Sequence, residues 1–126
     1  MIFGIGVDIA EIERFQRMVD RFGDRIAKRL LTNNELQQYK KRKRSLSFLA
    51  LRFAAKEATS KALGTGISGG VGFHSVEVMN NDMGKPELIF HGKALDLVRQ
   101  KKITRAMLSL SDERKYAVAM VVLETD

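Results

Sequence analysis

The spacing of apolar residues along the chain changes several times between a helical repeat and a strand-like pattern. We predict helices over residues 9–22, 25–31, 33–39, 48–63 and 93–101, the first from Ile12, Phe15, Val19 and Phe22. Strand-like apolar runs cover residues 2–7, 75–79, 87–91, 106–110 and 116–123, and the first is typical of a buried strand. The order of these elements departs from strict βαβ alternation. The pattern therefore predicts an α+β fold with a mostly antiparallel sheet packed with helices.

Residues typical of helix ends and turns mark the boundaries between these elements. Gly23 interrupts the first helical segment, and Thr32 with Glu35 three residues later forms a capping-box pattern. Ser47 precedes the long helix, and the five glycines of residues 64–72 follow it, as in a mobile or ligand-binding loop. We see no repeat, low-complexity segment or linker, and we expect residues 1–126 to form a single domain.

Composition narrows the class of protein and the compartment. The chain has no cysteine, which excludes disulfides, thiolate metal sites and cysteine nucleophiles and fits a reducing compartment. The longest apolar run, residues 117–123, is too short to span a bilayer, and no basic region precedes the first apolar residues. We therefore expect a cytoplasmic protein with no membrane partner. The net charge of +7 favours an anionic partner, whether nucleic acid, an acidic protein or a polyphosphate molecule.

The segment from Arg52 to Gly66 carries the densest candidate chemistry. Good helix formers dominate it, and Glu57 and Lys61 lie four residues apart on one face of the predicted helix. Arg52 and Lys56 share a neighbouring face by the same spacing. A carboxylate and several cations before a glycine turn suit a site for a metal ion and phosphate groups. An exposed Glu–Lys pair on an ordinary amphipathic helix explains the same spacing.

Two further features add to this picture. Asp8 follows the first apolar run, in the sequence G-I-G-V-D-I of residues 4–9. It is suited either to binding a metal ion or to capping the helix that follows, because Asp is a favoured N-cap residue. Lys85 and Pro86 follow Met83 and Gly84 in the turn between two strand-like segments.

Together these pieces resemble the holo-acyl-carrier-protein synthases, the small 4'-phosphopantetheinyl transferases. The resemblance rests on G-I-G-x-D-I at residues 4–9, R-F-A-x-K-E-A-x-x-K-A-x-G-T-G at residues 52–66 and G-K-P at residues 84–86. It covers essentially the whole chain, and the motifs are specific as a set. It implies the same mixed class of fold, assembled as a homotrimer with active sites between subunits.

The implied reaction transfers 4'-phosphopantetheine from coenzyme A to a serine of apo-acyl carrier protein, which primes fatty acid synthesis, and releases 3',5'-ADP. By the resemblance, Asp8 and Glu57 bind Mg²⁺ with the pyrophosphate of coenzyme A, in keeping with the oxygen ligands that Mg²⁺ prefers. Lys61 would donate to a phosphate oxygen and could protonate the leaving group. Glu57, through a metal-bound water, could accept the serine proton, and the sequence leaves the identity of this base open. The carrier brings the nucleophile, so none is needed in this chain.

The resemblance also assigns residues around coenzyme A. Arg52 matches a position near the 3'-phosphate, whereas the alignment of residues 40–44 is ambiguous, so that Lys43 and Arg44 only resemble such positions. The other expected coenzyme A contacts are Lys61, Gly64, Gly66 and Pro86, although a glycine turn after a helix is also an ordinary C-cap. Family members often carry His-Thr in the last hairpin turn, which reaches a neighbouring subunit's ligand. Here the turn has Asp112 and Glu113, a departure at an adenine-side contact.

The first predicted helix carries several arginines interleaved with Glu11, Glu13 and Asp20. In the family this helix receives the acidic helix of the carrier protein, and Arg14, Met18 and Arg21 match that pattern best. Methionine within a basic stripe also suits an adaptable interface. The simpler alternative is a solvated basic face beside a core stripe.

Two other classes of protein fit part of the sequence. The charge run of residues 40–44 is compatible with a nucleic-acid-binding module, but the chain has no recognisable nucleic-acid motif and no Trp for stacking. We therefore expect no nucleic-acid partner. A catalytically silent carrier-binding domain would not require Asp8, Glu57 and Lys61 together. His74 and His91 lack the spacing of a metal site and are typical of structural or surface residues.

Overall fold

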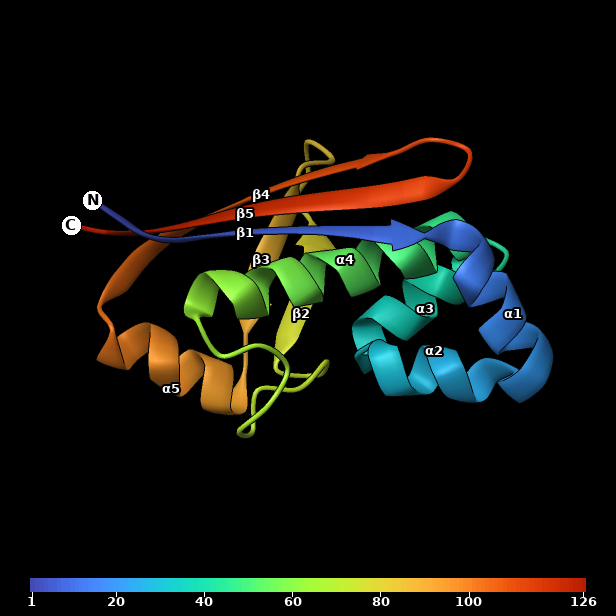
Figure 1. The fold of residues 1–126 in the computed structure, drawn as a ribbon, viewed down its shortest axis with the longest axis horizontal. Coiled ribbons are helices and arrows are strands. Elements are labelled where there is room, and N and C mark those ends of the chain that lie inside the picture. The colour runs from blue at the N-terminus through green and yellow to red at the C-terminus, as the bar shows by residue number, and fades with distance from the viewer.

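A three-stranded antiparallel sheet forms one layer of the computed structural model, which describes residues 1–126. Its strands are β1 (Ile2–Glu11), β5 (Tyr116–Thr125) and β4 (Ile103–Asp112), in that spatial order. Helix α4 (Leu46–Leu63) lies along this sheet and packs mainly against β1 and β5 (Figure 1). A separate hairpin pairs β2 (Val76–Asn80) with β3 (Pro86–Phe90).

The remaining helices gather around the two ends of α4 (Figure 1). Helices α1 (Ile12–Phe22), α2 (Asp24–Leu30) and α3 (Asn33–Lys41) lie at its N-terminal end, and α5 (Gly92–Gln100) lies beyond its C-terminal end. The α+β class and the antiparallel pairing predicted from the sequence are both confirmed. No helix combines the length and the apolar composition needed to cross a membrane.

The capping box at Thr32 was predicted correctly, the start of the long helix was predicted slightly too late, and the predicted start of the first helix is wrong. The capping box is present, because Thr32 N–H donates to Glu35 Oε1 at 2.8 Å and the Thr32 side chain accepts from Glu35 N–H. The long helix begins slightly earlier than expected, with Ser45 rather than Ser47 as its N-cap. The expected helix start at Ile9 is wrong, since β1 continues to Glu11.

Because β1 is longer than predicted, the structural role of Asp8 differs from a helix cap. The residue lies inside β1, opposite Ala119 of β5, and Glu11 occupies the N-cap position of α1. The helix-capping alternative for Asp8 is therefore wrong. The strand continues because the alternation of inward and outward residues persists through Ile9 and Ala10, which is the period expected of a strand and not of a helix.

The face of β1 turned toward α4 carries mainly small residues, and this allows a very close approach. A Cβ atom added at Gly4 would lie 2.0 Å from Ala62 O, and one added at Gly6 would lie 1.8 Å from Ala58 O. Only glycine fits at these two positions. Because side chains alternate along a strand, Asp8 shares this face with the two glycines and is carried up against α4.

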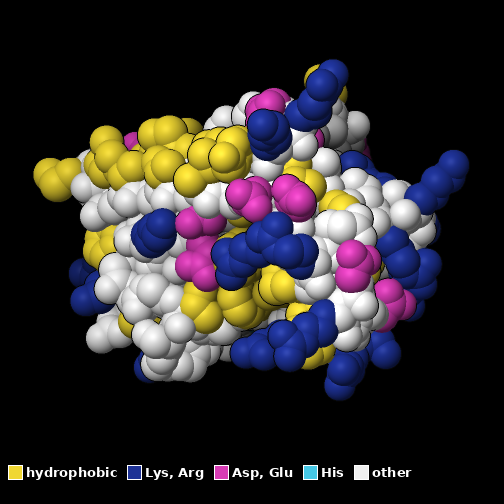
Figure 2. Space-filling view, turned by 45° about the vertical axis from the view of Figure 1, so that its right-hand side comes forward, with side chains coloured by type: hydrophobic (Ala, Val, Ile, Leu, Met, Phe, Trp, Pro, Cys, Tyr) yellow, Lys and Arg dark blue, Asp and Glu magenta, His cyan; other side chains and the backbone are white.

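The opposite face of β1 is apolar and open to solvent, so the prediction of a buried strand is wrong. The side chains of Ile5, Val7 and Ile9 alternate with the glycines and are 54%, 52% and 63% exposed. Register places these residues beside Val118, Met120 and Val122 of β5, and Met107 of β4 lies opposite Val122. Figure 2 shows an apolar band at its upper left, at the height of β1 in Figure 1. We refer to Ile5, Val7, Ile9, Met107 and Met120 as the outer sheet face.

Candidate active site

Asp8 meets Lys61 where β1 crosses the C-terminal half of α4. Lys61 Nζ lies 3.1 Å from Asp8 Oδ1 and 3.0 Å from the carbonyl oxygen of Val7. The second carboxylate oxygen, Asp8 Oδ2, is buried and has no hydrogen-bond partner. The alternative of a simple Glu57–Lys61 pair on one helix is therefore wrong, because the ammonium group of Lys61 bonds to β1.

Glu57 lies close to this pair and is electrostatically coupled to it. Burial raises the pKa of its carboxyl group, and the nearby Asp8 charge raises it further, while Lys61 and Arg14 act in the opposite direction. A cation beside Glu57 would offset the effect of the Asp8 charge on it. Figure 2 shows acidic side chains bordered by Lys and Arg side chains in the middle of the molecular face that it draws.

The donor set of Asp8 and Glu57 fits a hard divalent cation. Both residues offer carboxylate oxygens, and the only hydrogen-bond partner of the Asp8 carboxylate is the ammonium group of Lys61. No cluster of three or more histidine or acidic side chains forms a complete protein cage. This arrangement suits Mg²⁺, which usually takes one or two carboxylates and completes its octahedron with phosphate oxygens and water.

A second candidate subsite surrounds Arg52, one and a half turns before Glu57 on α4. Arg52 is only 4% exposed, and its Nε and Nη2 atoms are buried with no hydrogen-bond partner. Burial lowers the pKa of its guanidinium group to about 10, with Glu35 opposing this shift and Arg42 adding to it. A buried guanidinium with unused N–H groups is a strong binding element for a phosphate.

The guanidinium of Arg52 lines a pocket of about 320 Å³ between α4, β4 and the hairpin of β2 and β3. The pocket is lined by Arg42, Leu51, Arg52, Asn80, Gly84, Pro86, Leu108, Ser109 and Leu110. The structure thus brings the predicted site residues Arg52 and Pro86 together. They are 34 positions apart in the sequence, and both line this pocket.

The charge run after α3 contributes one arginine to this pocket, and it is Arg42. The guanidinium groups of Arg42 and Arg52 lie 5.2 Å and 4.4 Å from the ring centre of Phe48. Arg44 instead pairs with Asp24, with Nε 3.2 Å from Oδ1, and Lys43 does not line the pocket. The sequence had pointed to Lys43 and Arg44, and the position of Arg42 was missed because the alignment there is ambiguous.

The glycine turn after α4 is a helix C-cap. Gly64 adopts the left-handed conformation, with φ of 86°, and the N–H groups of Gly64, Thr65 and Gly66 all donate to Ser60 O. These N–H groups are therefore engaged within the protein. A Cβ atom added at Gly64 or Gly66 would meet nothing within 4 Å, so the turn has open space beside it. Close approach of a ligand to this backbone stays a prediction.

The arginines of α1 extend the charged surface away from the carboxylates. The Arg14 guanidinium lies over the ring of Phe53 on α4, 5.4 Å from its centre. The Arg21 guanidinium lies 5.1 Å from the ring centre of Phe22. Met18 lies between these arginines in the sequence and is half-buried against the core. The basic face of α1 is therefore continuous with the site at Glu57.

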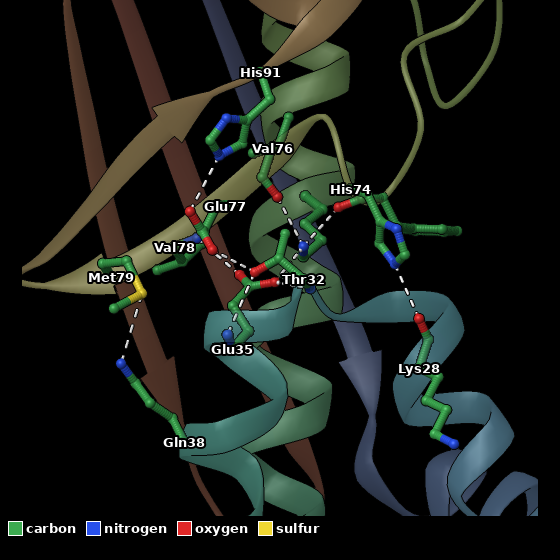
Figure 3. Close-up of polar contacts among 12 residues, drawn as sticks. Lys28, Thr32, Glu35, Gln38, His74, Val76, Glu77, Val78, Met79 and His91 are labelled. Atoms are coloured by element: carbon green, nitrogen blue, oxygen red, sulfur yellow. Dashed lines mark hydrogen bonds and ion pairs between the residues drawn. The ribbon is translucent and has the colours of Figure 1, made fainter.

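Lys56 does not belong to the site, although its sequence position suggested a phosphate-binding cation. It is fully buried, and its Nζ atom donates to Glu35 Oε1 at 2.6 Å, to Phe73 O at 2.6 Å and to Val76 O at 2.7 Å. Glu35 also accepts from the N–H groups of Thr32 and Val78. Figure 3 shows Glu35 of α3 within this network, beside Val76 and Val78 of β2.

The two histidines lie at the edge of this network. His91 Nε2 lies 3.1 Å from Glu77 Oε1, and His74 Nε2 lies 2.9 Å from Lys28 O (Figure 3). Glu77 is buried and also accepts from Thr32 Oγ1. Their side chains bond to different partners and neither lies at the carboxylate pair, in keeping with the structural role predicted for them.

A pair of carboxylates beside a lysine, together with a buried arginine that lines a pocket on α4, is an arrangement suited to a phosphorylated ligand. Residues 4–121 match the family model of the 4'-phosphopantetheinyl transferase superfamily. The chain belongs to this family.

Relatives of known sequence and structure agree with this assignment. The chain is 52% identical over 124 residues to the holo-[acyl-carrier-protein] synthases of Aliivibrio salmonicida and Vibrio cholerae, with 98% of each chain covered. The crystal structure of the synthase from Neisseria meningitidis is 42% identical, with a TM-score of 0.92 and 99% and 100% of the two chains covered. The Helicobacter pylori synthase in complex with coenzyme A is 29% identical, with a TM-score of 0.84 and 95% and 99% coverage.

Proposed function

We propose that this protein transfers 4'-phosphopantetheine from coenzyme A to a serine of apo-acyl carrier protein and releases 3',5'-ADP. The observation that carries the proposal is the arrangement on α4, where Arg52 lines a pocket and, further along the helix, Lys61 bonds to Asp8 of β1 close to Glu57. The 52% identical relatives and the coenzyme A complex of a structural neighbour support it. We treat residues 1–126 as one transferase domain, and we place it in the cytoplasm, where both substrates occur.

Asp8 and Glu57 would hold Mg²⁺ together with the pyrophosphate of coenzyme A. When bound, Mg²⁺ would neutralise the pyrophosphate and the developing charge on the leaving nucleotide, which is the main source of catalysis in phosphoryl-type transfers. The close approach of β1 to α4 at Gly4 and Gly6 holds Asp8 beside the helix that carries Glu57 before any ligand arrives. This preorganisation avoids a reorganisation cost during the reaction.

Lys61 would donate to a phosphate oxygen at the bond that breaks. Its ammonium group has three donors, and two are used on Val7 O and Asp8 Oδ1. It can therefore supply a proton or a hydrogen bond to the departing oxygen of 3',5'-ADP. Glu57, whose pKa is raised by burial and by Asp8, is the candidate acceptor for the serine proton.

Arg52, with Arg42 and the neighbouring Pro86, would hold the 3'-phosphate of coenzyme A. The buried Nε and Nη2 atoms of Arg52 have no partner within the protein, and Gly84 and Pro86 line the same pocket. The pantetheine arm would pass the turn at Gly64 and Gly66, where the structure leaves open space.

The basic face of α1, with Arg14, Met18 and Arg21, would receive the acidic helix of the carrier protein. Arg14 lies over Phe53 and is close enough to Glu57 to influence its pKa. A carrier bound to this face would therefore present its serine beside the carboxylates. Charge complementarity of this kind mainly accelerates encounter and fixes orientation.

We further propose that the protein is a homotrimer whose sites are completed between subunits. The outer sheet face supports this, because five apolar side chains on three neighbouring strands are 42–63% exposed. A contiguous apolar surface of this kind marks an association site. The small core of a chain of 126 residues also gains from burying more surface on assembly.

The role of Arg52 provides a direct test of the nucleotide assignment. Wild-type enzyme should prefer coenzyme A over 3'-dephospho-coenzyme A, and Arg52→Ala should lose about 10- to 100-fold of that preference, as expected for charge-assisted hydrogen bonds. Arg44→Ala is the matched control, because Arg44 pairs with Asp24 outside the pocket. If Arg52→Ala keeps the full preference in isothermal titration calorimetry, the 3'-phosphate binds elsewhere.

A further inference from the structure

The bond between Lys61 and Asp8 affects access to the proposed metal site. Asp8 is 14% exposed in its side chain, and Oδ2 is shielded from solvent. A metal ion from solvent would therefore reach the Asp8 carboxylate through Oδ1, and Lys61 Nζ already bonds to this oxygen at 3.1 Å. The Lys61 side chain itself is 50% exposed and free to take another position.

We propose that Lys61 competes with the divalent cation for Asp8 and that coenzyme A relieves this competition by drawing Lys61 onto its phosphates. The inference rests on the proposed function, which assigns Asp8 to the metal and Lys61 to the pyrophosphate. An ammonium group and a metal ion on one carboxylate oxygen repel each other, so the cation binds the free protein weakly. A pyrophosphate offers anionic oxygens to both cations, so the metal and coenzyme A bind with positive coupling.

The geometry gives Lys61 a short path between its two partners. Its Nζ atom is bonded to Val7 O and Asp8 Oδ1 inside β1, and one of its three donors is unused. The carbonyl oxygen of Val7 remains available to Lys61 after Asp8 is released. Lys61 can therefore leave Asp8 while it keeps one of its two present bonds to β1.

The coupling is measured with Mn²⁺ as the probe, by the paramagnetic resonance signal of free Mn²⁺ during titration of the full-length protein. Lys61→Ala should bind Mn²⁺ about tenfold more tightly than wild type without coenzyme A, equivalent to about 1.4 kcal/mol. Saturating coenzyme A should tighten Mn²⁺ binding to the wild type, and this tightening should be about tenfold smaller in Lys61→Ala. By reciprocity, Mn²⁺ should improve coenzyme A binding less in the variant.

Two control variants separate this inference from its alternatives. Arg14→Ala removes a cation near Glu57 that bonds to neither carboxylate, so its effect on Mn²⁺ binding should be clearly smaller. Equal tightening in Arg14→Ala and Lys61→Ala would mean general charge repulsion and would overturn the competition. If Lys61→Ala binds Mn²⁺ no better than wild type while Asp8→Ala loses binding, the inference fails and the metal site stands. If Asp8→Ala binds Mn²⁺ like wild type, the proposed metal site itself is wrong, and the inference falls with it.

Discussion

Replacing Gly6 by alanine tests whether the close contact between β1 and α4 sets the geometry of the site. The added Cβ atom would lie 1.8 Å from Ala58 O, 2.7 Å from Ala58 C and 2.9 Å from Ala62 N. All three are backbone atoms of a buried helix, so no flexible side chain can move aside. The strand must therefore separate from α4 at the residue that lies two positions before Asp8.

The size of the effect follows from these distances. A relaxed carbon–oxygen contact needs about 3.4 Å, so β1 must move by roughly 1.6 Å from its 1.8 Å position. Overpacking of this kind costs about 1–3 kcal/mol of unfolding free energy, or roughly 3–12 °C in melting temperature for a domain of this size. A misplacement of about 1 Å at a catalytic group can cost 10²-fold in rate, so turnover should fall by about that factor.

The assay compares Gly6→Ala with Gly72→Ala. An alanine at Gly72 meets nothing within 4 Å and replaces a glycine without a positive φ, so stability should change by less than about 0.5 kcal/mol. Thermal unfolding measures stability, and transfer kinetics are measured well below the melting temperature. Because the fold persists there, lost turnover reports the displaced Asp8. Wild-type stability and turnover in Gly6→Ala would refute the argument.

Three further predictions concern other parts of the fold. Lys56→Met should lower the unfolding free energy by about 3–5 kcal/mol, because Glu35 is left buried without its cation. In urea unfolding, the double variant with Glu35→Leu should recover part of this loss, and equal stability of Lys56→Met and wild type would contradict the prediction. Burial opposes ionisation of Glu77, but hydrogen bonds from Thr32 and His91 hold its pKa below the usual 4.5. Its ionised form therefore stabilises the fold above about pH 4.5, and this contribution disappears as the pH falls through the lower pKa of the folded state. The melting-temperature difference between wild type and Glu77→Gln should shrink between pH 6 and pH 3, and parallel curves would disprove the linkage. Arg14→Glu combined with Arg21→Glu should raise KM for the carrier protein, leave KM for coenzyme A nearly unchanged and lose its effect at high salt; unchanged carrier kinetics at low salt would place the docking surface elsewhere.

The sequence predicted the class of fold, and its short motifs pointed to candidate site residues that the structure brings together, because both depend on local signals. Apolar spacing defined most elements, and the Thr32–Glu35 capping box and the two hairpins are present in the structure. Asp8, Glu57 and Lys61 were selected from short motifs, and the structure brings Asp8 and Lys61 together across 53 positions of the sequence. Arg52 and Pro86 likewise meet in one pocket.

The features that the sequence did not predict are long-range contacts. The spacing of Glu57 and Lys61 could not show that Lys61 would bond to β1 instead of to its helical neighbour. Nothing in the local pattern marked Lys56 as buried, since its partner Glu35 lies 21 positions away on another helix. The apolar run of β1 gave no sign that its glycines face the core and its large residues face solvent.

The most direct test of the central claim is the mass of the carrier protein after reaction. Purified apo-acyl carrier protein is incubated with this protein, coenzyme A and Mg²⁺, and the carrier is then measured by intact-protein mass spectrometry. The account predicts the gain of one phosphopantetheine group on the carrier, dependent on Mg²⁺ and lost in Asp8→Ala and in excess EDTA. A carrier of unchanged mass after incubation with folded wild-type protein would contradict the account.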